Sequence, residues 1–316
     1  GERWCSLAYD AVNQELVQVG GHGGEHGTWL FDLVKNEWRK LDVGSAAMKD
    51  LSKQAAAHRW QAISLLGAAA NRFSVAETEA EAKADLAAAA RGLGEAFKKI
   101  GIQAGAAKVE TNEKAGLARA AELLAAMSDR YGSLAAKLGG KLDAVAMGEL
   151  RALKFEADHA CDALASEPPP RGLSPAVYDP EHKKIVVFGG DQLDRTFSDT
   201  WLYDCQTRRW EQRFPKKAPC PRAGHLMVWL PEARRIFLAG GYTRHRLAQD
   251  KWVYDVDRNE WGFINRVPLK NFQYFEPDPG SPGTPQPSPN GYPSVGAVVP
   301  GDSVVAMAPG SGTVLT

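Results

Sequence analysis

Short apolar runs that end in paired glycines recur along the chain. Residues 185–188 (Ile-Val-Val-Phe) lead into Gly189-Gly190, and residues 236–239 (Ile-Phe-Leu-Ala) lead into Gly240-Gly241. Runs this short, rich in β-branched and aromatic side chains and bounded by turn residues, predict buried strands. Paired glycines at a strand end permit a tight turn with positive φ.

An aromatic segment follows each glycine pair and predicts the next strand. Trp201-Leu202-Tyr203 and Trp252-Val253-Tyr254 both run into an aspartate that favours a hairpin turn, and a second tryptophan opens an outer strand. The first and second tryptophans are 9 residues apart in all three copies. The positions that define the copies are Gly20, Gly21, Trp29 and Trp38; Gly189, Gly190, Trp201, Tyr203 and Trp210; and Gly240, Gly241, Trp252, Tyr254 and Trp261. Four strands in about 50 residues match one blade of a propeller.

We call this repeated pattern of glycine pairs and aromatic residues the aromatic ladder. It resembles the kelch repeat of β-propellers over roughly half of the chain. Asp199-Thr200-Trp201 and Asp250-Lys251-Trp252 match the segment that leads into the third strand, and blade 1 has Phe31 where the others have tyrosine. The resemblance implies that the glycines pack near the blade core and that the aromatic side chains fill the space between neighbouring blades. We therefore expect these residues to be structural.

The copies do not complete a propeller, which typically closes with four to eight blades. We expect a mainly β fold with an α-helical insertion, in which three kelch-type blades and a half are interrupted by an Ala-rich helical bundle or hairpin. The expected domains are blade 1 (1–44), the helical insertion (45–167), blade 2 (168–214), blade 3 (215–266), a Pro-rich loop (267–293) and a partial blade (294–316). Such a chain is a fragment or needs further blades in trans, and its uncovered edges invite association.

The insertion separates Gly20 from Gly189 by 169 residues, whereas Gly189 and Gly240 are 51 apart. Apolar residues inside it alternate at steps of four and three, which predicts three to five amphipathic helices. They include Leu86, Ala90, Leu93, Phe97, Ile100, Leu117, Ala121, Leu124, Met127, Tyr131, Leu134, Leu138, Leu142, Val145, Leu150, Leu153 and Phe155, and earlier Met48, Leu51, Ile63, Leu65 and Leu66. We expect breaks at residues 101–105 and 139–140, and an end at residues 168–170, where prolines cannot continue a helix. The insertion is either a recognition or assembly module or a self-contained decorative bundle.

Composition narrows the class of protein. The formal net charge is zero and the pI is about 7.2, so no basic field argues for nucleic acid as a partner. The sequence has no run of 18 apolar residues, so no membrane span is predicted. The four cysteines lack Cys-x-x-Cys spacing, which disfavours zinc, while a Cys205–Cys220 disulfide stays open.

Two loops carry candidate chemistry. His22, Glu25 and His26 could recruit zinc or copper, but they lie in a glycine loop rather than in the helical His-Glu-x-x-His arrangement. Loops after the glycine pairs commonly line one face of a propeller, so Arg195, Arg244, His245 and Arg246 are the candidate contacts for a ligand or partner. The alternative is that these four are solvated loop charges.

No catalytic residue and no cofactor are predicted, because the chain lacks a nucleophile elbow, a phosphate-binding glycine loop and a zinc-protease motif. A non-enzymatic kelch scaffold that binds protein, with possible self-association and the insertion as recognition or assembly arm, is the leading hypothesis. Two alternatives stay open, a fragment of a galactose-oxidase-like copper enzyme and a carbohydrate-binding propeller. Fold alone does not choose among them.

Overall fold

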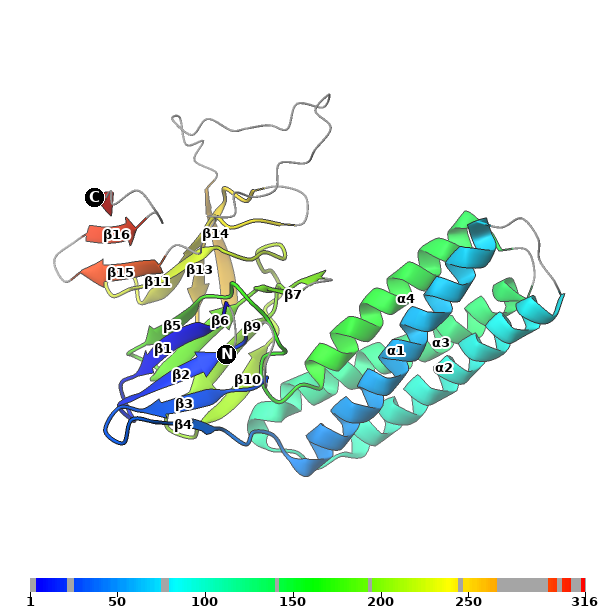
Figure 1. Ribbon diagram of the computed structural model, residues 1–316, viewed down its shortest axis with the longest axis horizontal. Coiled ribbons are helices and arrows are strands. Elements are labelled where there is room, and N and C mark those ends of the chain that lie inside the picture. The colour runs from blue at the N-terminus through cyan, green and yellow to red at the C-terminus, as the bar shows by residue number, and fades with distance from the viewer. Residues whose placement is uncertain are drawn as a thin grey trace, which may run out of the picture. The chain divides into compact units, whose positions relative to one another are not determined.

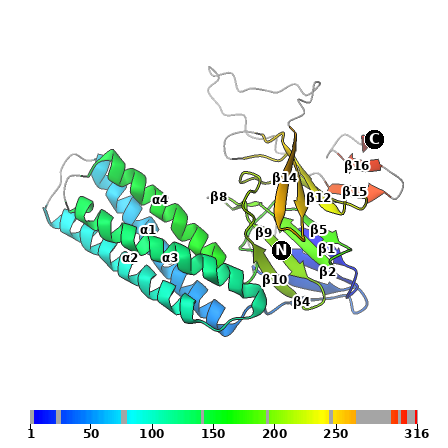
Figure 2. The same ribbon diagram turned by 180° about the vertical axis from the view of Figure 1, so that it is seen from behind.

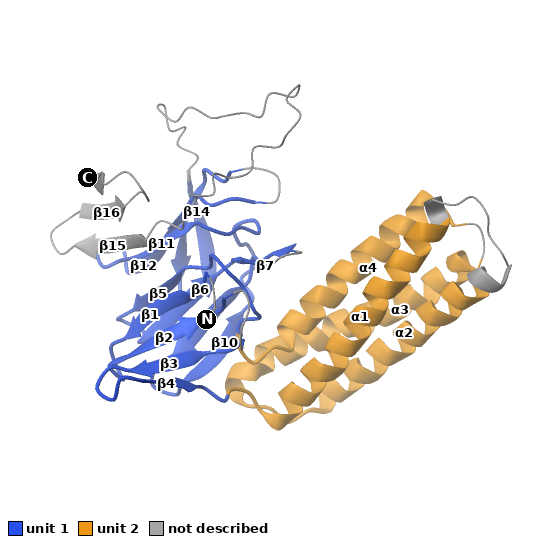
Figure 3. Cartoon of the chain, viewed as in Figure 1, with its two compact units in different colours: residues 1–42, 168–316 blue, residues 43–167 orange. Residues whose placement is uncertain are grey.

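The chain divides into two compact units in the computed structural model (Figure 3). Unit 1 comprises residues 1–42 and 168–316, and unit 2 comprises residues 43–167. The structure describes residues 4–21, 26–74, 80–139, 142–192, 195–243 and 247–265, together with three short strands near the C-terminus. The Pro-rich stretch predicted at 267–293 lies outside the described residues.

Unit 1 contains three four-stranded antiparallel sheets, one for each copy of the aromatic ladder (Figure 1). Blade 1 consists of β1 (Ser6–Asp10), β2 (Glu15–Val19), β3 (Trp29–Asp32) and β4 (Glu37–Lys40). Blade 2 consists of β5 (Ala176–Asp179), β6 (Lys184–Phe188), β9 (Thr200–Asp204) and β10 (Arg209–Arg213). Blade 3 consists of β11 (Leu226–Leu230), β12 (Arg235–Ala239), β13 (Lys251–Asp255) and β14 (Glu260–Asn265). Strands β1, β5 and β11 are adjacent in that order, so the first strands of successive blades lie side by side.

Smaller strands complete the described part of unit 1. A hairpin of β7 (Asp191–Gln192) and β8 (Arg195–Thr196) follows the glycine pair of blade 2, where the sequence predicted only a loop. Strands β15 (Val295–Val299), β16 (Ser303–Met307) and β17 (Val314–Leu315) form a three-stranded antiparallel sheet within the range predicted as a partial blade.

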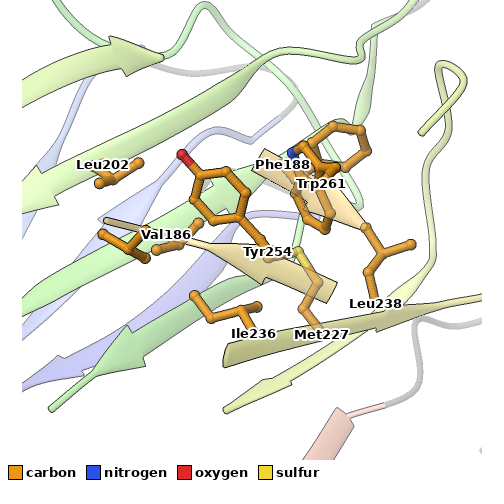
Figure 4. Close-up of a cluster of buried hydrophobic side chains, with 9 residues drawn as sticks. Val186, Phe188, Leu202, Met227, Ile236, Leu238, Tyr254 and Trp261 are labelled. Carbon is orange, nitrogen blue, oxygen red and sulfur yellow. The ribbon is translucent and has the colours of Figure 1, made fainter. Parts of the chain in front are cut away.

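The core between blades 2 and 3 is built from side chains of both sheets (Figure 4). Its buried members are Val186, Phe188, Leu202, Met227, Ile236, Leu238, Tyr254, Val256 and Trp261. The rings of Phe188 and Trp261, from different blades, have centroids 4.9 Å apart. Of the ladder aromatics, Trp201, Tyr203, Trp210, Tyr254 and Trp261 are buried and Trp29 and Trp252 are half-buried. Trp38 of blade 1 departs from the expected core position, because 46% of its surface is exposed.

Unit 2 is a four-helix bundle (Figure 2). Helices α1 (Ala46–Ser74) and α3 (Lys114–Leu138) each pack against both α2 (Ala80–Ala106) and α4 (Ala144–Ala163), and a 3₁₀ turn (Thr111–Glu113) precedes α3. These helices are 20 to 29 residues long, whereas the longest strand among the described residues has 6. The expected combination of antiparallel sheets with an inserted helical bundle is confirmed, and both are major components, so the described fold is mixed α/β.

Two details of the predicted helices were wrong. Gly101 does not break a helix, because α2 continues to Ala106, and a Cβ at Gly101 would make only an ordinary contact with Leu124 Cβ at 3.4 Å. Val145 and Phe155 of α4 are exposed, while Leu150 and Leu153 are buried. Phe155 follows Leu153 by two residues, and positions two apart point to different sides of a helix.

Buried Glu113 fastens the two ends of unit 2 to each other. Its Oε1 accepts hydrogen bonds from the backbone N–H of Ser45 at 2.8 Å and from Ser166 Oγ at 3.2 Å. Ser45 enters the bundle and Ser166 leaves it, so the insertion starts and finishes at one place. Insertions with adjacent ends are the kind that a host domain tolerates.

Candidate functional site

The glycine pairs mark where each blade meets the next and where its loops begin. Gly189 and Gly190 have φ of +63° and +102°, a region that L side chains rarely adopt. The backbone N–H of Gly190 donates to the carbonyl of Arg222 in blade 3 at 2.8 Å, and Gly21 makes the same bond to Arg171 in blade 2 at 2.6 Å. A Cβ at Gly189 would lie 2.6 Å from the Arg222 carbonyl, so the junction requires glycine for space as well as for conformation.

A clamp of arginine, aspartate and tryptophan anchors the loop after the glycine pair in blades 2 and 3. In blade 2, Arg171 donates to both carboxylate oxygens of Asp199 at 2.5 and 2.7 Å and to the carbonyl of Gly189 at 2.9 Å. Trp201 Nε1 donates to the same carboxylate at 2.7 Å. Burial raises the pKa of Asp199, but the charge and hydrogen bonds of Arg171 outweigh it and lower that pKa. The loop between Gly189 and Asp199 is thus tied at both of its ends.

Blade 3 repeats the clamp with Arg222, Asp250 and Trp252. Arg222 also donates to the Gly240 carbonyl at 3.0 Å, as Arg171 does to Gly189. Neither arginine was among the predicted contact residues. The signal that could have found them is the 51-residue step that relates Pro170-Arg171 to Pro221-Arg222.

Three polar residues lie on the anchored loops of blades 2 and 3. Tyr242 Oη donates to Asp191 Oδ2 at 2.7 Å across the blade boundary. Burial and this hydrogen bond raise the pKa of Tyr242, which keeps the phenol protonated as a donor. Arg195 pairs with Gln192 in the β7–β8 hairpin, and its guanidinium lies 4.5 Å from the centroid of the Phe197 ring. The guanidinium of Arg171 lies 4.0 Å from the same ring, which holds Phe197 in place.

We call Asp191, Arg195 and Tyr242 the loop cluster. All three are half-buried, so each keeps part of its surface in solvent. A carboxylate, a guanidinium and a phenol on fixed loops can make directional hydrogen bonds and ion pairs with a peptide surface. Of the four predicted contact residues, Arg195 belongs to this cluster, while Arg244, His245 and Arg246 lie outside the described residues.

The predicted metal loop is described only at its end. His26 is exposed, and His22 and Glu25 lie outside the described residues. Within the parts of the chain that the structure describes, no group of three histidine, cysteine, aspartate or glutamate side chains is arranged to hold a metal ion. None of the described helices is both long and apolar enough to cross a membrane.

His225 lies inside the junction of blades 2 and 3 rather than on the loop surface. It is fully buried, and its ring meets the Phe188 ring edge-on with centroids 5.6 Å apart. Burial, together with the positive charge of Arg222, lowers the pKa of His225 to about 3. The imidazole is therefore neutral at physiological pH and belongs to the packing between blades.

Comparison with known proteins agrees with the geometry of the blades. A sequence model of the KLHDC2/KLHL20/DRC7 kelch-repeats domain matches residues 130–270, a range that includes all of blades 2 and 3. The chain carries kelch repeats. Mei4-dependent protein 6 of Schizosaccharomyces pombe is 28% identical to it over 93 residues, which make up 27% of this chain and 13% of that relative.

Because blades 2 and 3 are copies of the same repeat, the arginine clamp and the glycine pair occur at equivalent positions in both. The 51-residue step relates Arg171 to Arg222, Asp199 to Asp250 and Gly189 to Gly240, and each set makes the same contacts. Kelch domains are, in general, scaffolds for protein interaction. In this chain a helical unit is inserted after the outer strand of blade 1.

Proposed function

We propose that this protein is a non-enzymatic kelch scaffold that binds another protein, with the loop cluster as a contact surface and the helical bundle as a recognition or assembly arm. The observation that carries the proposal is the anchoring of the loops by two buried arginine clamps. A contact surface gains affinity when its groups are already fixed before binding, because less conformational entropy is lost.

The surface of the bundle supports the role of an arm. Trp60 on α1 and Phe155 on α4 are both exposed, and these two helices pack against each other. Large exposed aromatic side chains are enriched at interfaces and dominate their energetics. Because Glu113 holds both ends of the insertion at one place, the bundle is able to act as a separate module.

The test is affinity capture from a cell lysate with the intact protein and matched variants. We expect Arg195→Ala to reduce at least one protein's recovery, and Arg195→Lys to reduce it less. Replacing residues 45–167 with a short linker is expected to abolish recovery of a partner that the arm recognises. Trp60→Ala and Phe155→Ala test the arm more finely, with Ile102→Ala, an exposed apolar position on α2, as the control.

The outcomes separate the two parts of the proposal. If only the Arg195 variant reduced the recovery of a partner, the bundle would have no role in binding. An unchanged set of captured proteins with every variant, including the deletion, would contradict the proposed function. Circular dichroism of each variant ensures that a loss of capture does not reflect unfolding.

A further inference from the structure

The outer-strand tryptophan of each later blade donates a hydrogen bond to a threonine of the blade before it. Trp210 Nε1 in blade 2 donates to Thr28 Oγ1 in blade 1 at 2.8 Å. Trp261 Nε1 in blade 3 donates to Thr200 Oγ1 in blade 2 at 3.0 Å. Both threonines directly precede the tryptophan of a third strand, so the contact is a repeated feature of the blade boundary.

Hairpin turns make a second contact at the same boundaries. Asn13, in the first turn of blade 1, donates from Nδ2 to the carbonyl of Cys205, in the last turn of blade 2, at 2.6 Å. His182, the counterpart of Asn13 in blade 2, lies 3.0 Å from Asp257 in the last turn of blade 3. Cys205 and its counterpart Val256 are consequently covered, with 0% and 6% of their surfaces exposed.

In blade 1 the surface that corresponds to these boundaries is exposed. Trp38 is 46% exposed, whereas its counterparts Trp210 and Trp261 are 1% and 4% exposed. Leu33, at the register position of Cys205 and Val256, is 49% exposed. The ring of Phe31 still packs against Trp38, with centroids 4.9 Å apart, so the aromatic pair is formed as in the other blades. Within the described residues, no acceptor lies at Trp38 Nε1.

We propose that Phe31, Leu33 and Trp38 form a docking face for a further kelch-type blade, which precedes blade 1 as blade 1 precedes blade 2. The occupant offers a hydroxyl acceptor before the tryptophan of its third strand and a turn that covers Leu33. The argument is continuity with two boundaries that use the same contacts at the same positions.

A second copy of the chain is a poorer occupant of this face. The hydroxyls of Thr28 and Thr200 already accept from Trp210 and Trp261. The corresponding residue of blade 3 is Lys251, whose ammonium group has no lone pair to accept a hydrogen bond. Among the described blades, none offers a second copy the hydroxyl that Trp38 needs.

The experiment adds a further blade to the full chain. Residues 171–221 are duplicated directly before residue 2, which preserves the spacing between blades 2 and 3. Hydrogen–deuterium exchange of a peptide covering residues 29–40 is then compared with and without the added blade. We expect exchange at least about fivefold slower with it, and a matched Thr→Val change at the acceptor of the added copy is expected to reverse part of that protection.

Each other outcome contradicts the proposal. Equal exchange with and without a protected added blade would mean that the face does not accept one. A dimer of the unextended chain by light scattering, with residues 29–40 protected, would make a second copy the occupant.

A separate pair of variants tests the face if the added blade does not fold. Leu33→Lys in the unextended chain is expected to leave the unfolding midpoint and the solution mass unchanged, because the face is open. Cys205→Lys, at the covered counterpart, is expected to lower the midpoint severely. A severe loss with Leu33→Lys would show that the face is already covered, and the proposal would be wrong.

Discussion

The guanidinium of Arg222 and the carboxylate of Asp250, 28 residues apart, form a bidentate ion pair, with Nη1–Oδ1 and Nη2–Oδ2 distances of 2.6 and 2.8 Å. Arg222 is fully buried. Burial raises the pKa of Asp250, but hydrogen bonds from Arg222 and Trp252 outweigh it and lower that pKa to about 2. The pair ties the entry of blade 3 to the end of the loop that follows its glycine pair.

Removing the charge of Asp250 is expected to destabilise unit 1 strongly. Asp250→Asn keeps the size of the side chain but leaves the Arg222 cation buried without a counter-charge, which typically costs about 3–5 kcal/mol. Urea unfolding measures the change. Arg258→Ala is the control, because Arg258 is 74% exposed and 3.7 Å from Asp255, and exposed pairs contribute about 0–1 kcal/mol. Equally small losses in both variants would show that the clamp is not structural.

Two histidines are expected to give opposite pH dependences. The folded pKa of His225 is about 3, below the ordinary value of 6.5, so its contribution to stability is complete above pH 6.5. That contribution is lost as the pH falls from 6.5 towards 3, by at most about 1.4 kcal/mol per pH unit. Burial lowers the pKa of His182, but hydrogen bonds to Asp179 and Asp257 outweigh it and raise the pKa. The contribution of His182 is therefore complete below pH 6.5 and is lost as the pH rises through its folded pKa.

Unfolding of His225→Leu and His182→Gln across pH 4 to 8 tests these signs. Relative to the parent protein, the leucine variant should lose less stability on acidification, and the glutamine variant should lose less on alkalinisation. The same direction of change in both variants would contradict the assignment. Because each comparison is a difference from the parent, the titration of the many carboxylates cancels.

The repeat made the blades predictable, while the contacts between them were not. Trp201-Leu202-Tyr203 and Trp252-Val253-Tyr254 were predicted as strands and are confirmed as parts of β9 and β13. Both segments form strands because they are apolar and are bounded by turn residues, and both features can be read directly from the sequence. The β7–β8 hairpin has only two residues in each strand, too few for any periodicity to emerge.

The loop cluster was only partly predictable for a related reason. Arg195 could be chosen from its place after a glycine pair, but Asp191 and Tyr242 are 51 residues apart and meet only because blades 2 and 3 pack side by side. In the helical unit, Glu113 bonds to residues 68 and 53 positions away, which no local pattern indicates. Long-range polar contacts of this kind follow from the assembled fold.

The cysteines are expected to differ sharply in reactivity. All four are free, so the Cys205–Cys220 disulfide that the sequence left open is not formed in the structure. Burial, followed by the charge of Asp10, raises the pKa of the Cys205 thiol, and the thiol is the unreactive form. Cys220 is exposed, and Arg222 Nη2 lies 3.1 Å from its sulfur. In native protein, iodoacetamide should modify Cys220 well before Cys205, as peptide mass spectrometry would measure. Equal rates would contradict this assignment, and urea should make both cysteines reactive.

Two glycines of helix α3 are expected to respond oppositely to the same substitution. A Cβ at Gly116 would lie 2.4 Å from the carbonyl oxygen of Ala163 in α4, and that backbone atom cannot rotate away. Gly116→Ala should therefore force the helices apart at a cost of about 1–3 kcal/mol, which is typical of overpacking. Gly132 has no heavy atom within 4 Å of such a Cβ. Gly132→Ala should stabilise the bundle by up to about 1 kcal/mol, since alanine restricts the unfolded chain and favours the helix.

Thermal unfolding followed at 222 nm reports on both variants, because most of the helical signal comes from this bundle. The shared helix and the identical change in chemistry remove propensity as an explanation of any difference in sign. If Gly116→Ala stabilised the bundle as Gly132→Ala does, the close approach of α3 to Ala163 would be wrong. Opposite signs would locate that approach at the N-terminal end of α3, next to Glu113 and the point where the chain enters and leaves the bundle.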